Sequence, residues 1–480
     1  MLLKTNYSML TDFYEFTMSN GYLEQGVGDT IAYFDMFFRK VPDGGGYAIM
    51  AGVEQLVNYL KNLSFADEDI VYLRSKGCFS ERFLDYIKNF RFECDVWAVP
   101  EGSPIFPGEP IVTVRGPVMQ AQFIETMLLL TINHQSLIAT KASRMVRAAQ
   151  GRTVLEFGSR RAQGADGAVL GARAAYIGGC AGTACVLCDR DYSVPAAGTM
   201  AHSWVQMFEC EYDAFRAYAE TYPQDCTLLI DTYNVLKSGI VNAIRTAHEV
   251  LEPRGYRLKG VRIDSGDMAY LSKQIRKILD ENGLTDCKIV VSNSLDEFLI
   301  RDLILQGAQI DTFGIGERLI TSKSEPVFGG VYKLAAIENG KGDIIPRIKI
   351  SENVEKITNP HFKKVWRLVD NQTGQYLADV LTLHDEVIDG SQPYTIFDPE
   401  HTWKRKTLVN FTAVPLLEPI FEKGQCVYTP RDVHEIRSSC QDKLSRLWAE
   451  ITRFENPHPY YVDLSQKLWN IKNSLLQKFN

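Results

Sequence analysis

One histidine of the chain lies among residues with small side chains. His202 is part of the segment GTMAHSW, residues 198–204, and the whole chain has only eight histidines. Small neighbours leave backbone amide groups accessible to a ligand, and an imidazole can act as a base, a metal ligand or a nucleophile. The alternative is a structural histidine near the end of a strand, so the other motifs must decide between the two.

Two further segments combine charged residues with glycine. GVRIDSGD contains Arg262, Asp264 and Asp267, and the alternation of side chains along a strand predicts that Arg262 and Asp264 share a face. Arginine beside carboxylates can bind an anionic substrate while an aspartate binds hydroxyl groups or Mg²⁺, or the group can be a structural ion pair. TFGIGERL contains Gly314 and Gly316, which would let backbone N–H groups approach a phosphate but are also typical of an ordinary turn.

Three more segments add aromatic, polar and basic candidates. In EFGSRRAQG, Phe157 and Arg160 could hold a flat anionic heterocycle by stacking and by charge. LIDTYN contributes Asp231, and Arg318 follows the glycines of TFGIGERL. SNSLD contributes Ser292, Asn293 and Asp296. The competing interpretation is core packing for the phenylalanine, helix capping for the three SNSLD side chains and solvent-exposed charge for the arginines.

These clusters all lie at the ends of short apolar runs that read as strands. Between residues 151 and 340, six short apolar runs end in the polar or glycine-rich segments VLEFGSRR, GTMAHS, TLLIDTYN, GVRIDSGD, IVVSNSLD and TFGIGERL. The runs follow one another at roughly the length of a βα unit, about 30 residues. This rhythm predicts an α/β fold, an irregular (β/α) barrel whose chemistry lies at the C-terminal ends of the strands.

The pattern changes on either side of this region. We expect an N-terminal α+β domain over residues 1–130, with a small β subdomain at about 96–117, and the barrel over 131–345. Residues 346–480 read as a β-rich and then helical segment that packs on the N-terminal domain.

Composition excludes several classes of protein. The chain has 480 residues, of which 45% are hydrophobic and 23% charged, and its net charge of −7 disfavours a nucleic-acid groove. No apolar run reaches about 18 residues and no signal peptide is expected, so we predict a cytoplasmic protein without membrane spans. Cys180, Cys185 and Cys188 include a CxxC pair, but no second pair lies at zinc-site spacing.

Taken together, the motifs resemble those of the nicotinate phosphoribosyltransferase family, which are type II phosphoribosyltransferases. The resemblance extends over most of the chain and rests on LTDFYEFTM, EGSPIFPGEPIVTVRGP, EFGSRRAQG, GTMAHSW, LLIDTYN, VRIDSGD, SNSLDE, FGIGERL and GGVYKL. It implies ATP-coupled transfer of the 5-phosphoribosyl group from phosphoribosyl pyrophosphate to nicotinate in NAD biosynthesis. It also implies an irregular α/β barrel and a homodimer whose active sites lie at the interface.

The resemblance assigns roles to individual residues. His202 matches the family's phosphorylated histidine, which accepts a phosphoryl group from ATP with Mg²⁺ present. For the pyridine ring, the resemblance places Tyr14 of the neighbouring subunit on one face and Phe157 on the other, with Thr199, Arg262 and, more weakly, Ser203 beside nicotinate. It places Asp231, Asp264 and Asp267 near the ribose and its magnesium. The 5-phosphate is matched to Gly314 and Gly316, and Arg39 of the neighbouring subunit is matched to the phosphates. Glu317 departs from the threonine that many relatives have, and it would repel a phosphate unless it points away or pairs with Arg318.

Three other functions remain open at this point. A nicotinamide-specific relative would share the fold, the donor and the histidine, although SRRAQG favours an acidic substrate. A non-catalytic metabolite-binding barrel would tolerate the loss of His202 and the carboxylates, which are all present. A zinc-dependent barrel hydrolase would need several histidines at the strand ends, where the motifs supply only His202.

Overall fold

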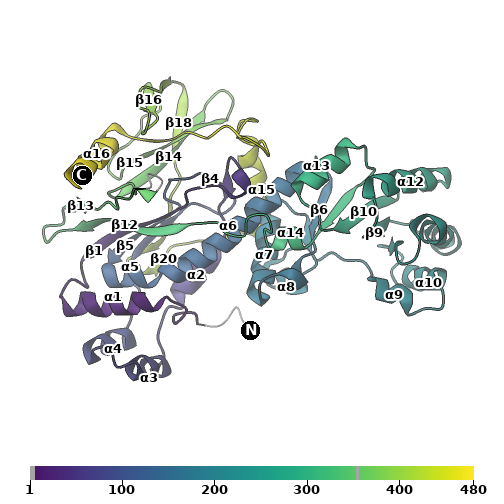
Figure 1. The fold of residues 1–480 in the computed structure, drawn as a ribbon, viewed down its shortest axis with the longest axis horizontal. Coiled ribbons are helices and arrows are strands. Elements are labelled where there is room, and N and C mark those ends of the chain that lie inside the picture. The colour runs from purple at the N-terminus through teal and green to yellow at the C-terminus, as the bar shows by residue number, and fades with distance from the viewer. Residues whose placement is uncertain (1–5, 353–355, 480) are drawn as a thin grey trace. The chain divides into compact units, whose positions relative to one another are not determined.

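The chain divides into two compact units. The structure is a computed structural model that describes residues 6–352 and 356–479 (Figure 1). One unit combines Met1–Leu137 with Val327–Asn480, and the other is Ile138–Pro326. The boundary at residue 137 falls inside the long helix α6 (Glu125–Ala148).

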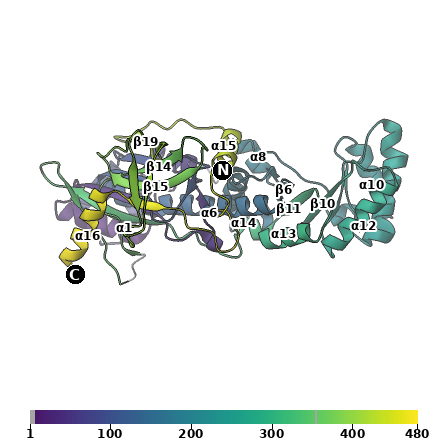
Figure 2. The same ribbon diagram turned by 90° about the horizontal axis from the view of Figure 1, so that it is seen from above.

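The second unit is built on a sheet of six short parallel strands. Neighbouring strands of this sheet are labelled in Figures 1 and 2. In spatial order they are β7 (Gly182–Thr183), β6 (Thr153–Glu156), β11 (Thr312–Ile315), β10 (Lys288–Asn293), β9 (Gly260–Ile263) and β8 (Thr227–Leu229). Parallel neighbours require crossover connections, and helical segments supply them. These are η3 (Ser159–Arg161), α7 (Ala165–Ile177), α8 (Val186–Tyr192), α9 (His202–Gln206), α10 (Glu211–Thr221), η4 (Val235–Gly239), α11 (Ile240–Thr246), η5 (Ala247–Leu251), η6 (Glu252–Arg254), α12 (Met268–Glu281) and α13 (Glu297–Leu305). The short helix α14 (Glu317–Ile320) follows the last strand, β11.

The sequence of β9 shows why the apolar runs form this sheet. Val261 and Ile263 are buried and point to one face, whereas Arg262 points to the other. β-branched side chains suit such a strand because they pack well on a pleated surface. The apolar residues therefore anchor the strand and leave its opposite face for polar groups.

The predicted α/β fold is confirmed at the level of a parallel sheet with helical crossovers, and one strand was predicted wrongly. The pairings form an open series from β7 to β8, and within the described residues none joins its two ends. GTMAHS does not end a strand: apart from an isolated bridge between Thr183 and Ala196, the segment before His202 is irregular, and His202 begins α9. The strand in this part of the sheet is the two-residue β7, which is too short to give an apolar run.

The first unit contains two larger antiparallel sheets and two short strand pairs. One sheet has the order β13 (Ile344–Pro346), β12 (Val331–Glu338), β1 (Ile31–Phe37), β5 (Val112–Pro117), β3 (Asp95–Ala98), β19 (Glu418–Glu422) and β20 (Gln425–Cys426). The other has the order β18 (Phe411–Pro415), β14 (Lys363–Asp370), β15 (Tyr376–Leu383) and β21 (Val462–Leu464), in which β15 and β21 are the one parallel pair. The short pairs are β2 (Ala48–Ile49) with β4 (Pro104–Ile105) and β16 (Tyr394–Phe397) with β17 (Arg405–Leu408).

Strands from the two ends of the chain therefore share one sheet, because β12 pairs with β1 and β19 pairs with β3. The helices of this unit are α1 (Phe13–Glu24), the turn η2 (Pro42–Gly44), α2 (Val53–Lys61), α3 (Asp67–Ser75), α4 (Glu81–Lys88), α5 (Val118–Phe123), α15 (Val433–Ser445) and α16 (Gln466–Phe479). Among the described residues, no helix is both long and apolar enough to cross a membrane.

Candidate active site

The carboxyl ends of parallel strands meet at one edge of a sheet, and the second unit places most of the predicted side chains there. Asp231 follows β8, Arg262 and Asp264 lie at the end of β9, Asn293 ends β10, and Phe157 follows β6. Because these strands are neighbours, residues as far apart in the chain as Phe157 and Gly314 lie within a few ångströms of one another.

His202 is held by Asp231. Its Nε2 lies 3.0 Å from Oδ1 of Asp231, whose side chain is only 1% exposed, whereas the imidazole is 39% exposed. The other carboxylate oxygen of Asp231 accepts hydrogen bonds from the backbone N–H of Asp264, at 2.8 Å, and the hydroxyl of Ser265, at 2.7 Å. Asp231 is thus fixed from three sides and orients a histidine that remains accessible to a ligand.

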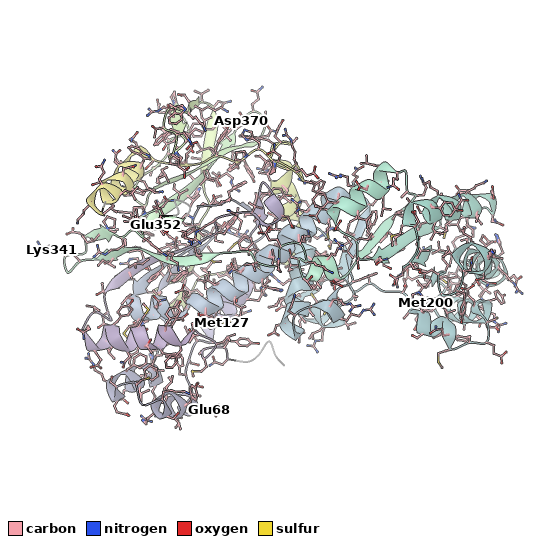
Figure 3. All side chains as sticks on the ribbon, viewed as in Figure 1. Glu68, Met127, Met200, Lys341, Glu352 and Asp370 are labelled. Atoms are coloured by element: carbon pink, nitrogen blue, oxygen red, sulfur yellow. The ribbon has the colours of Figure 1, made fainter. Side chains whose placement is uncertain are left out.

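Arg262 lies at the centre of a second network. Its Nη1 donates to Oγ1 of Thr199, at 2.8 Å, and to the carbonyl of Met200, at 3.2 Å. Met200 is labelled in Figure 3 and lies in the segment that leads to α9. Nε of Arg262 donates to Oγ of Ser292, at 2.9 Å, and that hydroxyl donates to Oδ1 of Asp264, at 2.5 Å. The predicted group of Thr199, Arg262 and Asp264 is therefore one connected cluster.

Phe157 lies directly against the glycine of the neighbouring strand. A Cβ atom on Gly314 would be 2.6 Å from Cδ2 and 2.7 Å from Cε2 of the Phe157 ring. The guanidinium carbon of Arg262 lies 6.0 Å from the centre of the same ring. Gly314 thus creates the space for an aromatic ring beside a cation, which is an arrangement that suits a flat anionic ligand.

The residues after β11 have different partners from those expected. Arg318 forms an ion pair with Asp296, and Glu317 pairs with Nζ of Lys323 at 2.6 Å. The hydrogen bond from Lys323 lowers the pKa of the partly exposed Glu317 carboxyl. Glu317 is thus held ionised by Lys323 rather than by Arg318, the partner that the sequence offered.

The other residues predicted for the site in the second unit have exposed side chains or accept hydrogen bonds from nearby backbone N–H groups. Oδ1 of Asp267 accepts from the backbone N–H of Tyr270 and caps α12, and Oδ1 of Asn293 accepts from the N–H of Ser294. Arg160, in η3, and Ser203, in α9, have exposed side chains. Gly316 is the residue immediately before α14.

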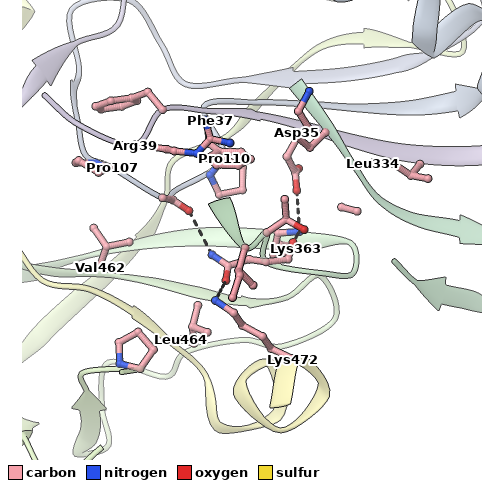
Figure 4. Close-up of a pocket in the computed structure, with 18 of the residues that line it drawn as sticks. Asp35, Phe37, Arg39, Pro107, Pro110, Leu334, Lys363, Val462, Leu464 and Lys472 are labelled. Carbon is pink, nitrogen blue, oxygen red and sulfur yellow. Dashed lines mark hydrogen bonds and ion pairs between the residues drawn. The ribbon is translucent and has the colours of Figure 1, made fainter. Parts of the chain in front are cut away.

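Tyr14 and Arg39 belong to the first unit. Tyr14 is 43% exposed on α1. Arg39 lines a cavity of about 220 Å³ together with Lys333, Lys363 and Lys472 (Figure 4). Lys363 is neutralised there by Asp35, at 2.7 Å, so the basic groups of this cavity are partly compensated.

Two buried residues of the site have roles that the sequence did not indicate. Ser292, one of the SNSLD candidates for which helix capping was the alternative, bridges Arg262 and Asp264. Glu156 accepts hydrogen bonds from the N–H of Gly158 and from the Thr183 hydroxyl, and burial raises the pKa of its carboxyl. A carboxylate as the last residue of an apolar run is the sequence signal that could have identified Glu156.

The carboxylates of the site do not form a metal cage by themselves. Among the described residues, no group of three or more His, Cys, Asp and Glu side chains could hold a metal ion. Both oxygens of Asp231 are engaged, whereas only Oδ1 of Asp264 has a hydrogen-bond partner within the described chain. Mg²⁺ commonly binds through one or two carboxylates together with substrate phosphates, and Asp264 fits that role better than Asp231.

Comparison with known proteins gives consistent matches along the chain. Residues 9–133 match the nicotinate phosphoribosyltransferase (NAPRTase) N-terminal domain, residues 153–371 match the NAPRTase family, and residues 362–472 match its C-terminal domain. Nicotinate phosphoribosyltransferase of Bacillus subtilis is 43% identical over 467 residues, which cover 97% of this chain and 94% of the relative. The human protein of that name is 33% identical over 524 residues, with coverages of 97% and 96%.

Solved structures agree with these matches. The crystal structure of human nicotinic acid phosphoribosyltransferase has a TM-score of 0.86 and 32% identity, and the match covers 97% of this chain and 99% of that one. A nicotinate-nucleotide pyrophosphorylase from Pyrococcus furiosus, at a TM-score of 0.70 and 24% identity over 92% of this chain and 96% of that one, shows the shared fold alone. The resemblance inferred from the motifs is confirmed, and the chain belongs to the nicotinate phosphoribosyltransferase family.

Proposed function

We propose that this protein transfers the 5-phosphoribosyl group from phosphoribosyl pyrophosphate to nicotinate, with coupled hydrolysis of ATP. The observation that supports it most directly is the continuous network at the strand ends, which joins Thr199, Arg262, Ser292 and Asp264. A cation, a carboxylate and an aromatic ring in one place match an anionic heterocycle that reacts with a sugar. We assign this chemistry to the α/β region expected over residues 131–345.

Nicotinate is proposed to bind between Phe157 and Arg262. The pyridine ring would stack on Phe157, and the Arg262 guanidinium would pair with the carboxylate beside the Thr199 hydroxyl. Arg160 and Ser203 are exposed and would contact the ligand from the rim of the site. Nicotinamide is the weaker substrate in this arrangement, because its neutral amide gains little from a cation.

Transfer requires the bond between C1 of the ribose and pyrophosphate to break while the pyridine nitrogen donates its lone pair to C1. Positive charge develops on the ribose, and the Asp264 carboxylate would stabilise it. Mg²⁺, when bound with the substrate phosphates and Asp264, would neutralise charge on the pyrophosphate. No protein base is needed, because the pyridine nitrogen has no proton to lose.

His202 is proposed to accept the γ-phosphoryl group of ATP. Its Nε2 lies against Asp231, so an Nε2–H donor directed at that carboxylate leaves the lone pair on Nδ1 as the nucleophile. The Nδ1–P bond would form as the bond from the γ-phosphorus to ADP breaks, and Asp231 would stabilise the resulting cationic ring. The phosphorylated histidine would then couple ATP hydrolysis to transfer.

The phosphates of the donor are assigned to the loops after β9, β10 and β11. We propose backbone contacts at Gly314 and Gly316, with Asp267 and Asn293 near the ribose. Arg318 could contribute only if a phosphate competes with its ion pair to Asp296. We also propose a homodimer in which Tyr14 and Arg39 of the neighbouring subunit complete the site.

An irregular barrel is consistent with the order of the strands. The open series starts at β7, to which Ala196 adds a bridge, and ends at β8. No backbone pairing joins β7 to β8 within the described residues, but two side-chain contacts join the segment after Ala196 to the far end of the series. His202 contacts Asp231, which follows β8, and Thr199 contacts Arg262 on β9. We propose that these contacts, rather than backbone hydrogen bonds, close the barrel.

The test is nucleotide formation from phosphoribosyl pyrophosphate with nicotinate, nicotinamide or quinolinate, each with and without Mg-ATP. We expect product from nicotinate, with a rate that ATP raises. His202→Ala should lose the ATP stimulation and the acid-labile label from γ-³²P-ATP but retain slow transfer. Turnover of nicotinamide in preference would favour the runner-up enzyme, and binding without turnover of any base would favour a metabolite-binding protein.

A further inference from the structure

The Ser292 hydroxyl stands between the two groups of opposite charge in the site. Ser292 is only 4% exposed on β10, where its Oγ is 2.9 Å from Nε of Arg262 and 2.5 Å from Oδ1 of Asp264. The direction of both hydrogen bonds is fixed, because a guanidinium can only donate and an ionised carboxylate can only accept. The single proton of Ser292 is therefore committed to Asp264, and a lone pair is committed to Arg262.

This arrangement leaves one edge of the guanidinium available. Nη1 is used by Thr199 and Met200, and Nε is used by Ser292. Nη2 lies 3.8 Å from Oδ1 of Asp264, which is beyond hydrogen-bond distance, and no other described residue bonds to it. The two N–H groups on Nη2 are thus unused although a carboxylate lies nearby.

Arginine and a carboxylate at this separation normally form a direct, often bidentate, pair. Such a pair would neutralise Arg262 and, if bidentate, would also engage Oδ2 of Asp264, which has no hydrogen-bond partner among the described residues. From this geometry we propose that Ser292 is a positioning residue, which holds Asp264 away from Arg262 so that the guanidinium stays free for the substrate carboxylate. The inference rests on the proposed function, because it takes nicotinate as the anion that Arg262 binds.

Loss of the Ser292 hydroxyl should weaken the binding of nicotinate in particular. Without the hydroxyl, Asp264 would move onto Arg262 and compete with nicotinate for Nη2. The affinity for nicotinate should fall about 10- to 100-fold, which is the usual contribution of one charge-assisted hydrogen bond. Nicotinamide does not need the cation, so its weak binding should change little.

The test is the dissociation constant of nicotinate, measured by calorimetry on the full chain, for wild type and Ser292→Ala. The matched control is Ser294→Ala, which removes an exposed hydroxyl two residues further along the chain and should leave the affinity unchanged. Ser292→Thr keeps the hydroxyl and should retain most of the affinity. Thermal unfolding of each variant reports whether the fold is intact.

A double variant separates positioning from simple structural support. In Ser292→Ala with Asp264→Asn, no charge remains to capture Arg262, so nicotinate binding should recover although transfer is lost. Failure to recover, or a Ser292→Ala variant that binds nicotinate as wild type does, would overturn the inference while the proposed function stands. A wild-type protein that neither binds nor converts nicotinate would instead overturn the proposed function, and the inference with it.

Discussion

Glycine at position 314 determines how close an aromatic ring can lie to β11. An alanine Cβ there would be 2.6 Å from the Phe157 ring, a distance that forces the ring to rotate away. Gly314→Ala should therefore raise the KM for nicotinate by about 2- to 10-fold, the usual worth of an aromatic contact, with a smaller effect on the KM for the donor. Steady-state kinetics with each substrate varied in turn measures both values.

The control for this substitution is Gly340→Ala. Position 340 has no heavy atom within 4 Å of an added Cβ, so both KM values should stay at the wild-type level. A KM for nicotinate that stays at the wild-type value in Gly314→Ala would mean that Phe157 does not form the nicotinate site.

At the scale of elements, the spacing of the apolar runs located β8 and β9, which precede Asp231 and Asp264, and β10 and β11, which contain Asn293 and Gly314. It misplaced the segment that leads to His202, which is irregular and is followed by a five-residue helix. Such a segment has no periodicity, since its position depends on side-chain contacts with β8 and β9 that lie 29 or more residues further along the chain. The bridging role of Ser292 was equally invisible, because it depends on strand neighbours rather than on any local pattern.

Two elements of the first unit contain buried acids that link stability to pH. Burial raises the pKa of Glu15, on α1, from 4.5 to about 7, and that of Asp463, on β21, from 3.8 to about 7. A raised pKa in the folded state means that the folded protein binds the proton more tightly than the unfolded chain. The stabilisation is complete below the ordinary pKa values, near pH 4, and is lost as pH rises to about 7.

Thermal unfolding between pH 5 and 8 should therefore show a melting temperature that falls with rising pH and becomes flat above about pH 7. Glu15 alone accounts for about 3 kcal/mol across this window if its whole shift is expressed. Glu15→Gln and Asp463→Asn mimic the protonated forms and should each make the dependence shallower. Parallel pH curves for the wild type and both variants would show that neither carboxyl is protonated in the native protein near neutral pH.

At the scale of the whole molecule, the proposed homodimer divides each active site between two chains. His202 would act in its own subunit, whereas Tyr14 would act in the site of its neighbour. Two impaired chains can then complement one another, because a mixed dimer of Tyr14→Ala and His202→Ala contains one site with both wild-type residues and one with neither. If Tyr14 served its own subunit instead, every site in the mixture would lack one of the two residues.

Co-expression of the two variants with different tags isolates the mixed dimer by sequential purification. Random pairing makes about half of the dimers mixed, and each has one intact site, so the unfractionated mixture should recover about a quarter of the wild-type ATP-stimulated rate. The purified mixed dimer should recover about half, measured at a nicotinate concentration below the KM so that loss of stacking by Tyr14 is visible. Recovery depends on an exposed tyrosine of α1 reaching a histidine in another chain, so a mixed dimer no more active than its parents would place Tyr14 outside the site.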